Sequence, residues 1–417
     1  MNEQPASLPN GFRDSTGEAL LRPDPSPLPE DWQVVRLREV ARVDWGNTSL
    51  TKSIYTSSGY PVFSASGQDG YSDFYEHEGK AVILSAIGAR CGKCFFASGR
   101  WTAIKNTIII KTYENTANPL FLYYLLNEES KWPRSGSGQP FISIGKAKAV
   151  VIPLPPLPEQ RAIAHVLTSI QRAIEATEQV IAAARELKKS LMRHLFTYGP
   201  VSPAEAESVP LQETEIGPLP VHWRVVRLGE VAQIEMGQSP PSITYNSEGI
   251  GLPFFQGKAD FGDIYPITRK WCSSPNKIAE KDDILLSVRA PIGDVNIATQ
   301  RCCIGRGLTA IRAGAKSDSK YLFYHLLFSQ ELLESKGTGT TFKQINKETV
   351  THFLIPLPPL PEQRAIAEML GAVDEKIQAE ENRKTALQSL FRSMLHHLMT
   401  GKVRVAGLVT PPTQPEE

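Results

Sequence analysis

The chain has 417 residues, of which 41% are hydrophobic and 21% charged, a composition typical of folded globular proteins and not of disordered ones. No apolar run approaches the roughly 18–20 residues that a membrane-spanning helix needs, and the first residues lack the basic and apolar stretches of a signal peptide. Five cysteines do not indicate a disulfide framework. We therefore expect a cytoplasmic protein.

The net charge of +1 is unevenly distributed along the chain. Residues 32–149 contain 14 Lys and Arg against 9 Asp and Glu (14 − 9 = +5), and residues 223–351 contain 16 against 13 (16 − 13 = +3). The connector at 200–218 has four Glu and no Lys or Arg. Two mildly basic regions are compatible with phosphate binding, although a solvated mixed surface would look similar.

The sequence contains an internal repeat of two copies. LPEDWQVVRLREVARVDWGNT, from Leu28, returns as LPVHWRVVRLGEVAQIEMGQS, from Leu219, and IPLPPLPEQRAIAHVL, from Ile152, returns as IPLPPLPEQRAIAEML, from Ile355. The ends of the two copies are nearly identical, whereas their middles diverge. The repeat therefore predicts one frame with two different recognition surfaces.

Each front part alternates short β-rich stretches with an amphipathic helix. The stretches are YPVFSA, AVILSAI, KCFFAS and NTIIIK in the first copy and ILLSV, VNIAT and LTAIR in the second. PLFLYYLLNEE and KYLFYHLLFSQELL are the expected helices. This pattern predicts an α/β (α+β) domain in each copy.

The proline runs exclude helix, and Pro158 and Pro361 suit the first turn of the long helix that follows each run. A heptad repeat then continues over about four heptads, which predicts a coiled-coil pair. Packing of each helix on its own domain remains the alternative. The expected interface residues are Leu167, Ile170, Ile174, Ile181, Leu191, Leu195, Leu370, Val373, Ile377, Leu387, Phe391, Met394 and Leu398.

Chain reach favours an antiparallel pair. Each helix of roughly 40 residues spans about 60 Å, and the connector at 200–218, even fully extended, reaches only about 63 Å. A parallel pair would stretch that connector along the whole helix, whereas an antiparallel pair would not. One compatible register places Lys188 opposite Glu380.

The paired WxVVRLxEVA segments and the twin IPLPPLPEQRAIA segments resemble those of the specificity subunits of type I restriction–modification systems, over residues 28–402. The resemblance implies two target recognition domains joined by two long antiparallel helices with internal pseudo-two-fold symmetry. We therefore expect target recognition domains at 28–157 and 219–360, long helices at 158–199 and 361–401, and a linker at 200–218. From their sequence, residues 1–27 are expected to be flexible and residues 402–417 to form a disordered tail.

The resemblance also implies a function. Each recognition domain would read one half of a bipartite, asymmetric sequence in double-stranded DNA, and the helices would dock two modification (methyltransferase) subunits, which motor–nuclease restriction subunits join. The chain itself would be non-catalytic and hold no cofactor; S-adenosylmethionine, ATP and Mg would be bound by partner subunits. The absence of NPP[YFW], GxxxxGK[ST] and GxSxG segments supports this non-catalytic role.

Two other functions remain open: a coiled-coil adaptor that binds no DNA, and a stand-alone sequence-specific regulator. A metal site is also conceivable at Cys91 and Cys94, but their counterparts in the repeat are Ile292 and Val295. Apolar residues at the same positions favour buried cysteines that act as small hydrophobic side chains. We therefore expect no metal.

Polar and basic residues of the divergent middles are the candidate DNA contacts, because Arg and Lys bind phosphates or guanine and Asn and Gln bind adenine. Trp32, Trp223, Tyr123, Tyr124 and Tyr324 are expected to pack in cores instead. The candidates are Lys52, Tyr60, Gln68, Arg90, Lys93, Lys105 and Gln139 in the first copy, and Gln256, Lys258, Arg269, Lys270, Arg289, Arg306, Lys343 and Gln344 in the second.

Overall fold

A computed structural model describes residues 27–129, 132–136, 138–338 and 343–405. The described residues form two compact units: unit 1 comprises those within 1–177 and 383–417, and unit 2 comprises those within 178–382. The helix α4 (Leu157–Tyr198) begins in unit 1 and ends in unit 2, whereas α10 (Leu360–Met399) begins in unit 2 and ends in unit 1. No helix within the described ranges is long and apolar enough to cross a membrane.

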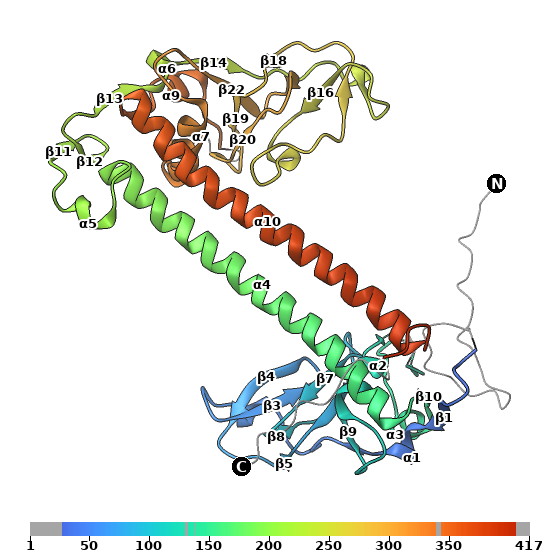
Figure 1. Ribbon diagram of the computed structural model, residues 1–417. Helices are drawn as coiled ribbons and strands as arrows, with labels where there is room; N and C mark the ends of the chain where they lie inside the picture. The colour runs from blue at the N-terminus through green and yellow to red at the C-terminus, as the bar shows by residue number, and fades with distance from the viewer. Residues whose placement is uncertain (1–26, 130–131, 137, 339–342, 406–417) are drawn as a thin grey trace. The chain divides into compact units, whose positions relative to one another are not determined.

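Unit 1 contains two four-stranded sheets, β2-β9-β6-β7 and β4-β3-β8-β5, and a β1-β10 pair (Figure 1). Its elements before α4 are β1 (Gln33–Arg36), α1 (Leu37–Val40), β2 (Ala41–Trp45), η1 (Lys52–Ile54), β3 (Tyr60–Ser64), β4 (Gly67–Ser72), β5 (His77–Glu78), β6 (Ala81–Ser85), β7 (Cys94–Ala97), β8 (Arg100–Ala103), β9 (Thr107–Thr112), α2 (Pro119–Leu126), α3 (Ile144–Ala149) and β10 (Val151–Leu154).

Unit 2 repeats this plan with sheets β14-β22-β19-β20 and β15-β17-β16-β21-β18 and a β13-β23 pair. Its elements are α5 (Pro203–Ala206), β11 (Leu211–Thr214), β12 (Gly217–Pro220), β13 (Arg224–Arg227), α6 (Leu228–Val231), β14 (Ala232–Met236), η3 (Ser242–Thr244), β15 (Tyr245–Asn246), β16 (Leu252–Phe255), η4 (Lys258–Asp260), β17 (Trp271–Cys272), β18 (Ile278–Ala279), β19 (Ile284–Ser287), β20 (Val295–Ile297), β21 (Cys302–Ile304), β22 (Leu308–Ala313), α7 (Ser319–Phe328), α8 (Gln330–Ser335), α9 (Lys347–Thr351) and β23 (Leu354–Leu357).

The central strand of each unit is buried on both faces. In β6, Val82 and Leu84 belong to the larger core cluster while Ile83 belongs to the smaller one. In β19, Leu286 and Leu285 are divided in the same way. Successive side chains of a strand point to opposite faces, so these continuous apolar runs place each sheet between two cores. The α+β class expected from the repeat is confirmed.

In both units, the recurring Trp-containing segment pairs with the recurring proline motif. Strand β1 pairs antiparallel with β10, and β13 pairs with β23. The indole Nε1 of Trp32 donates to Glu159 at 3.1 Å, and that of Trp223 donates to Glu362 at 2.8 Å. The recurring Trp and Glu are therefore partners, and both indoles are buried.

The glutamine of each proline motif joins the long helix to the short one. The Gln160 amide accepts from the backbone N–H of Asn118 and donates to the carbonyl of Pro155, each at 2.8 Å. Gln363 repeats this pattern with Asp318 and Pro358, again at 2.8 Å. Both amides are buried, so the motif positions α2 and α7 by satisfied buried hydrogen bonds.

The long helices pair antiparallel within each unit. In unit 1, Leu167 of α4 shares a core cluster with Leu398 near the end of α10. In unit 2, Arg185 pairs with Glu381 while Lys188, further along α4, pairs with Asp374. The register expected from the heptads differed, because it placed Lys188 opposite Glu380; instead, the Lys188 ammonium lies 2.6 Å from Asp374, and Glu380 accepts from Lys376.

The expected interface positions have reduced exposure along both helices. Fully buried members are Leu167, Ile174, Ile181, Leu195, Leu370 and Leu398, and half-buried members are Ile170, Leu191, Val373, Ile377, Leu387, Phe391 and Met394. Most positions of α4 and α10 between these residues are exposed. The less exposed residues therefore recur with heptad spacing and form a seam.

The connector after α4 is folded, although the sequence indicated only a linker. β11 and β12 form a hairpin in which Thr214 pairs with Gly217, whose φ is +103°. The amide of Gln212 donates to the carbonyl of Trp223 at 2.9 Å, and Ile216 packs against the unit 2 core. Side-chain anchoring of this kind leaves no signal in the composition.

The start of the C-terminal tail is also ordered, which corrects the disorder expected from residue 402 onward. Val405 is buried, and Arg404 donates to Glu159 and to Asp31 of unit 1. This ion cluster holds residues 402–405 against the N-terminal part of the same unit. The remainder of the tail, 406–417, and residues 1–26 lie outside the described part of the chain.

Acid is expected to destabilise unit 2 through His325. The imidazole is buried against Phe196 at 5.2 Å between ring centroids, and burial lowers the pKa of His325 to about 3. The unfolded chain has a pKa of about 6.5, so it binds the proton first, and stability falls as the pH drops from about 6.5 towards 3. The free energy of unfolding, measured by denaturant unfolding at several pH values in this range, should depend less on pH in His325→Phe than in wild type. The control His352→Gln, at an exposed site, should keep the wild-type dependence on pH.

Candidate nucleic-acid interface

Loops carrying candidate DNA contacts meet at one end of the unit 1 sheets. The backbone N–H of Ala86 donates to the carbonyl of Asn106 at 3.0 Å, and that of Ile142 donates to Ala86 at 2.8 Å. The guanidinium of Arg90 donates to the carbonyl of Ser66 at 2.7 Å. We call this surface, formed by residues 47–52, 64–68, 86–93, 104–106 and 138–141, the loop face of unit 1.

Unit 2 builds its loop face with the same bonds. The N–H of Val288 donates to Gly307 at 2.9 Å, and that of Ile345 donates to Val288 at 3.0 Å, as Ala86 and Ile142 do in unit 1. The N–H of Gly307 also donates to Gln256 at 3.1 Å. This loop face comprises residues 237–244, 256–260, 288–293, 305–307 and 343–345.

Most candidate side chains of the loop faces are exposed. Exposed members are Lys52, Gln68, Arg90, Lys105, Gln139, Gln256, Lys258, Arg289, Arg306, Lys343 and Gln344, whereas Lys93 is half-buried. Residues 289 and 344 form an isolated β-bridge, which brings Arg289 next to Gln344. Arg269 and Lys270, both exposed, lie on the segment beside this face, where the Arg269 guanidinium donates to Ala259 at 2.6 Å.

Tyr60 lies apart from the other unit 1 candidates. It begins strand β3, whereas the loop face follows the end of that strand at Ser64. Its ring lies 4.9 Å from that of Tyr75, and the Arg100 guanidinium lies 5.0 Å from the Tyr75 ring. The strand therefore separates Tyr60 from Arg90 and its neighbours.

Some basic side chains of the loop faces form ion pairs with acidic residues and others do not. Lys52 pairs with Asp69 at 2.6 Å and Lys258 pairs with Asp294 at 2.8 Å. Burial opposes the charge of Asp69, but hydrogen bonds from Lys52, Tyr55 and Ser64 outweigh it and lower the Asp69 pKa. Within the described ranges, Arg289 and Arg306 form no ion pair, so their charge is available to an anionic ligand.

The cysteines and core aromatics lie away from solvent. All five thiols are free and buried, and burial raises the pKa of the Cys302 and Cys303 thiols to about 12. Cys94 Sγ donates to the carbonyl of Leu126. No cluster of metal-ligating side chains occurs among the residues that the structure describes. Tyr124 and Tyr324 are buried on α2 and α7, and Tyr123 is half-buried.

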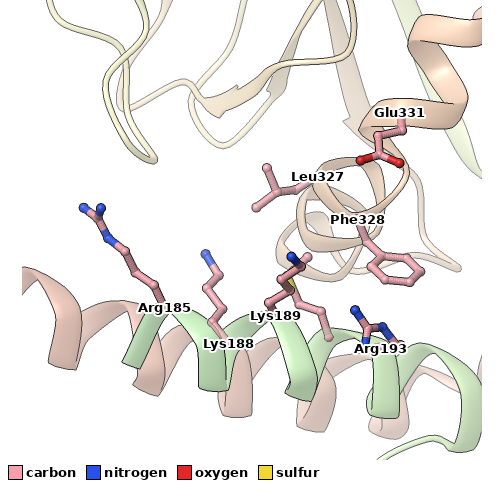
Figure 2. Close-up of a pocket in the computed structure, with 8 residues that line it drawn as sticks. Arg185, Lys188, Lys189, Arg193, Leu327, Phe328 and Glu331 are labelled. Atoms are coloured by element: carbon pink, nitrogen blue, oxygen red, sulfur yellow. The ribbon is translucent and has the colours of Figure 1, made fainter. Parts of the chain in front are cut away.

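A groove of about 470 Å³ lies elsewhere in unit 2, between α4 and the α7–α8 segment. Figure 2 shows the basic side chains of Arg185, Lys188, Lys189 and Arg193 extending from α4 on the side that faces Leu327, Phe328 and Glu331. Phe328 is 45% exposed. The groove combines positive charge with apolar surface, and we call it the helix groove.

The loops after β2 and β14 also belong to the loop faces, although the sequence singled out Lys52 alone from them. Asn47 donates from its backbone to Ala103 at 2.8 Å, and Gln238 donates to Ile304 at 3.1 Å. The hydroxyl of Ser239 accepts from the Arg306 N–H at 3.2 Å. Their position directly after the recurring strand was the available signal.

Comparisons with known proteins find a family model and relatives that match most of this chain. A family model described as the type I restriction modification DNA specificity domain matches residues 29–185 and 220–389. A Methanocaldococcus jannaschii relative, named as a specificity subunit of the type I restriction enzyme MjaX, is 36% identical over 91% of this chain and 95% of its own.

Solved structures show the same likeness. A chain from a study of complex assembly and conformational transition of the type I R-M system is 31% identical, with a TM-score of 0.55 over 91% of this chain and 100% of that one. The S subunit from M. genitalium, at 19% identity, shares the fold with a TM-score of 0.65 over 88% of this chain and 96% of its own. The two matched segments and the near-complete coverage establish that the chain belongs to the type I restriction–modification DNA specificity family.

Proposed function

We propose that the chain is the DNA-reading subunit of a type I restriction–modification complex and that each unit reads one half of a bipartite target in double-stranded DNA. The observation that carries this proposal is the pair of loop faces. Both are built with the same backbone bonds, yet the same isolated β-bridge carries different side chains, Ile87 and Phe141 in unit 1 and Arg289 and Gln344 in unit 2. One frame with two chemistries suits an asymmetric target.

The chain supplies no catalytic group in this proposal. Two modification subunits would methylate adenine with S-adenosylmethionine, and restriction subunits would use ATP and Mg to move and cut DNA in the cytoplasm. The helix groove supports protein docking, because exposed Phe328 beside basic Lys189 and Arg193 suits a partner surface that is apolar and acidic.

Methylome sequencing of cells that contain this chain and its modification partner tests the function. A methylated-adenine motif with two specific halves and an unread spacer is expected. Loss of two-part specificity would contradict the proposal. An adaptor that reads no DNA would leave partner assembly intact but produce no motif, and a stand-alone regulator would bind its target without co-purifying methyltransferase.

Arg289→Ala should weaken binding to the cognate duplex by about tenfold, the cost of one good base or phosphate contact. The side chain is exposed and follows the end of β19 on the loop face. Lys281→Ala is the matched control, because this exposed cation precedes the other end of the same strand. Fluorescence anisotropy at physiological salt measures both; equal affinities of Arg289→Ala and wild type would exclude the contact.

A further inference from the structure

Ile243 on the loop face of unit 2 is almost completely exposed. Its side chain is 92% accessible, compared with 59% for Ile250 and 49% for Ile267. Single exposed apolar residues are common on protein surfaces, so exposure alone identifies no site. Ile243 differs from a typical exposed residue because the neighbouring residues fix its backbone and keep its side chain in solvent.

The turn that carries Ile243 is fixed on both sides. Pro240 and Pro241 precede it with restricted backbones, and the Tyr245 hydroxyl donates to the carbonyl of Pro240 at 2.7 Å. The Thr244 hydroxyl donates to Pro241 at 2.7 Å. The Tyr245 ring stacks on Phe254 with a centroid distance of 4.5 Å. The chain on either side of Ile243 is therefore anchored while its side chain projects outward.

The turn is tethered to the same loops as the candidate DNA contacts. Gln238 donates to the carbonyl of Ile304, and Ser239 accepts from the N–H of Arg306. Arg306 is exposed and forms no ion pair within the described ranges. An anionic polymer bound by this arginine would therefore meet the turn.

The corresponding turn of unit 1 has different chemistry. It is the 3-10 turn Lys52–Ile54, which precedes Tyr55 as Ser242–Thr244 precedes Tyr245. Ser53 therefore occupies the place of Ile243. The same structural position is polar in one unit and apolar in the other, as expected of a position that distinguishes two half-sites.

We propose that Ile243 is a base-contacting residue of unit 2 and that it packs against the 5-methyl group of thymine in the half-site read by this unit. This inference rests on the proposed DNA-reading function. An aliphatic side chain beside a positively charged loop matches thymine in the major groove, where a methyl group is the apolar feature of the base edges. The contact would add sequence preference without neutralising a phosphate.

The experiment measures anisotropy of the full chain with the duplex defined by methylome sequencing. Ile243→Ala should bind the cognate duplex about tenfold more weakly, with an unchanged dependence on salt, because no phosphate contact is lost. Ile250→Ala is the control, since it truncates another exposed isoleucine in the turn with Asn246. Replacing the half-site thymines by deoxyuridine should weaken wild type but leave Ile243→Ala unchanged.

Wild-type affinity of Ile243→Ala would overturn the inference. So would an equal loss on cognate and unrelated duplexes, an equal loss in Ile250→Ala, or insensitivity of wild type to deoxyuridine. If wild type itself does not select the cognate duplex, the proposed function fails and the inference fails with it. Selection by wild type without a role for Ile243 would contradict the inference alone.

Discussion

Replacing Lys188 by methionine is expected to lower the free energy of unfolding of unit 2 by about 3 kcal/mol, because it removes one partner from a buried ion pair. The side chains of Lys188 and Asp374 are only 16% and 10% exposed. Asp374 also accepts from the Tyr324 hydroxyl at 2.8 Å. Without the ammonium, its carboxylate would remain in a poorly solvated position between the helices. Denaturant unfolding followed by circular dichroism measures the change.

The double variant Lys188→Met with Asp374→Leu should recover most of the lost stability, because replacing both charges by apolar groups removes the unpaired carboxylate. Arg185→Ala is the matched control on the same helix. Its partner is Glu381, and the Arg185 side chain is 60% exposed, so its loss should cost less than about 1 kcal/mol. Equal losses in Lys188→Met and Arg185→Ala would disprove the special role of burial.

Arg404→Ala is expected to destabilise unit 1 by about 2 kcal/mol, which allows for solvent screening of a partly exposed cation. Its guanidinium donates to the two carboxylate oxygens of Glu159 at 2.6 and 2.8 Å. The Glu159 side chain is 1% exposed, whereas that of Arg404 is 38% exposed. In the variant, the carboxylate would lose both bonds from the guanidinium and keep the hydrogen bond from the Trp32 indole.

Thermal unfolding of the full chain tests the contribution of this ion cluster to stability. Adding Glu159→Gln to Arg404→Ala should restore part of the stability, because a neutral amide costs less to bury than a carboxylate. Arg301→Ala removes a more exposed arginine, 59% accessible and 3.3 Å from Glu280, and should leave the transition nearly unchanged. A transition of Arg404→Ala at the wild-type temperature would show that the cluster adds no stability.

Regular patterns made much of the fold predictable. The heptads and Pro158 predicted a helix at 158–199, and α4 spans Leu157–Tyr198. The apolar stretch AVILSAI predicted a strand, and β6 spans Ala81–Ser85 within it. All residues of β6 are buried, as in a strand covered on both faces. Repetition of these signals also predicted that unit 2 would resemble unit 1.

Features that depend on single side-chain contacts were missed. The hairpin of the connector is fixed by Gln212 and Ile216, and the tail by Arg404. The helix register could not be obtained from the heptads, because the pairing of Lys188 with Asp374 depends on how α7 fills the space beside them through Tyr324. None of these contacts has a periodic signature.

The candidate interface was predictable in residue type but not in geometry. The divergent middles indicated where recognition residues such as Arg289 and Gln344 would lie, and the structure brings these two together. It also separates Tyr60 from the others along β3. Ile243 was missed because only polar and basic side chains were expected to contact DNA. Individual DNA contacts remain predictions.

The division of the chain sets the order in which the protein can be completed during synthesis. Unit 2 is continuous from residue 178 to 382, whereas unit 1 needs residues 383–405 as well as the N-terminal part. Unit 1 therefore cannot complete its core until residues 383–405 have also left the ribosome. Leu398 and Val405 then close its core. A product terminated between residues 382 and 405 would contain all of unit 2, but it would expose the incomplete core of unit 1 to chaperones and proteases.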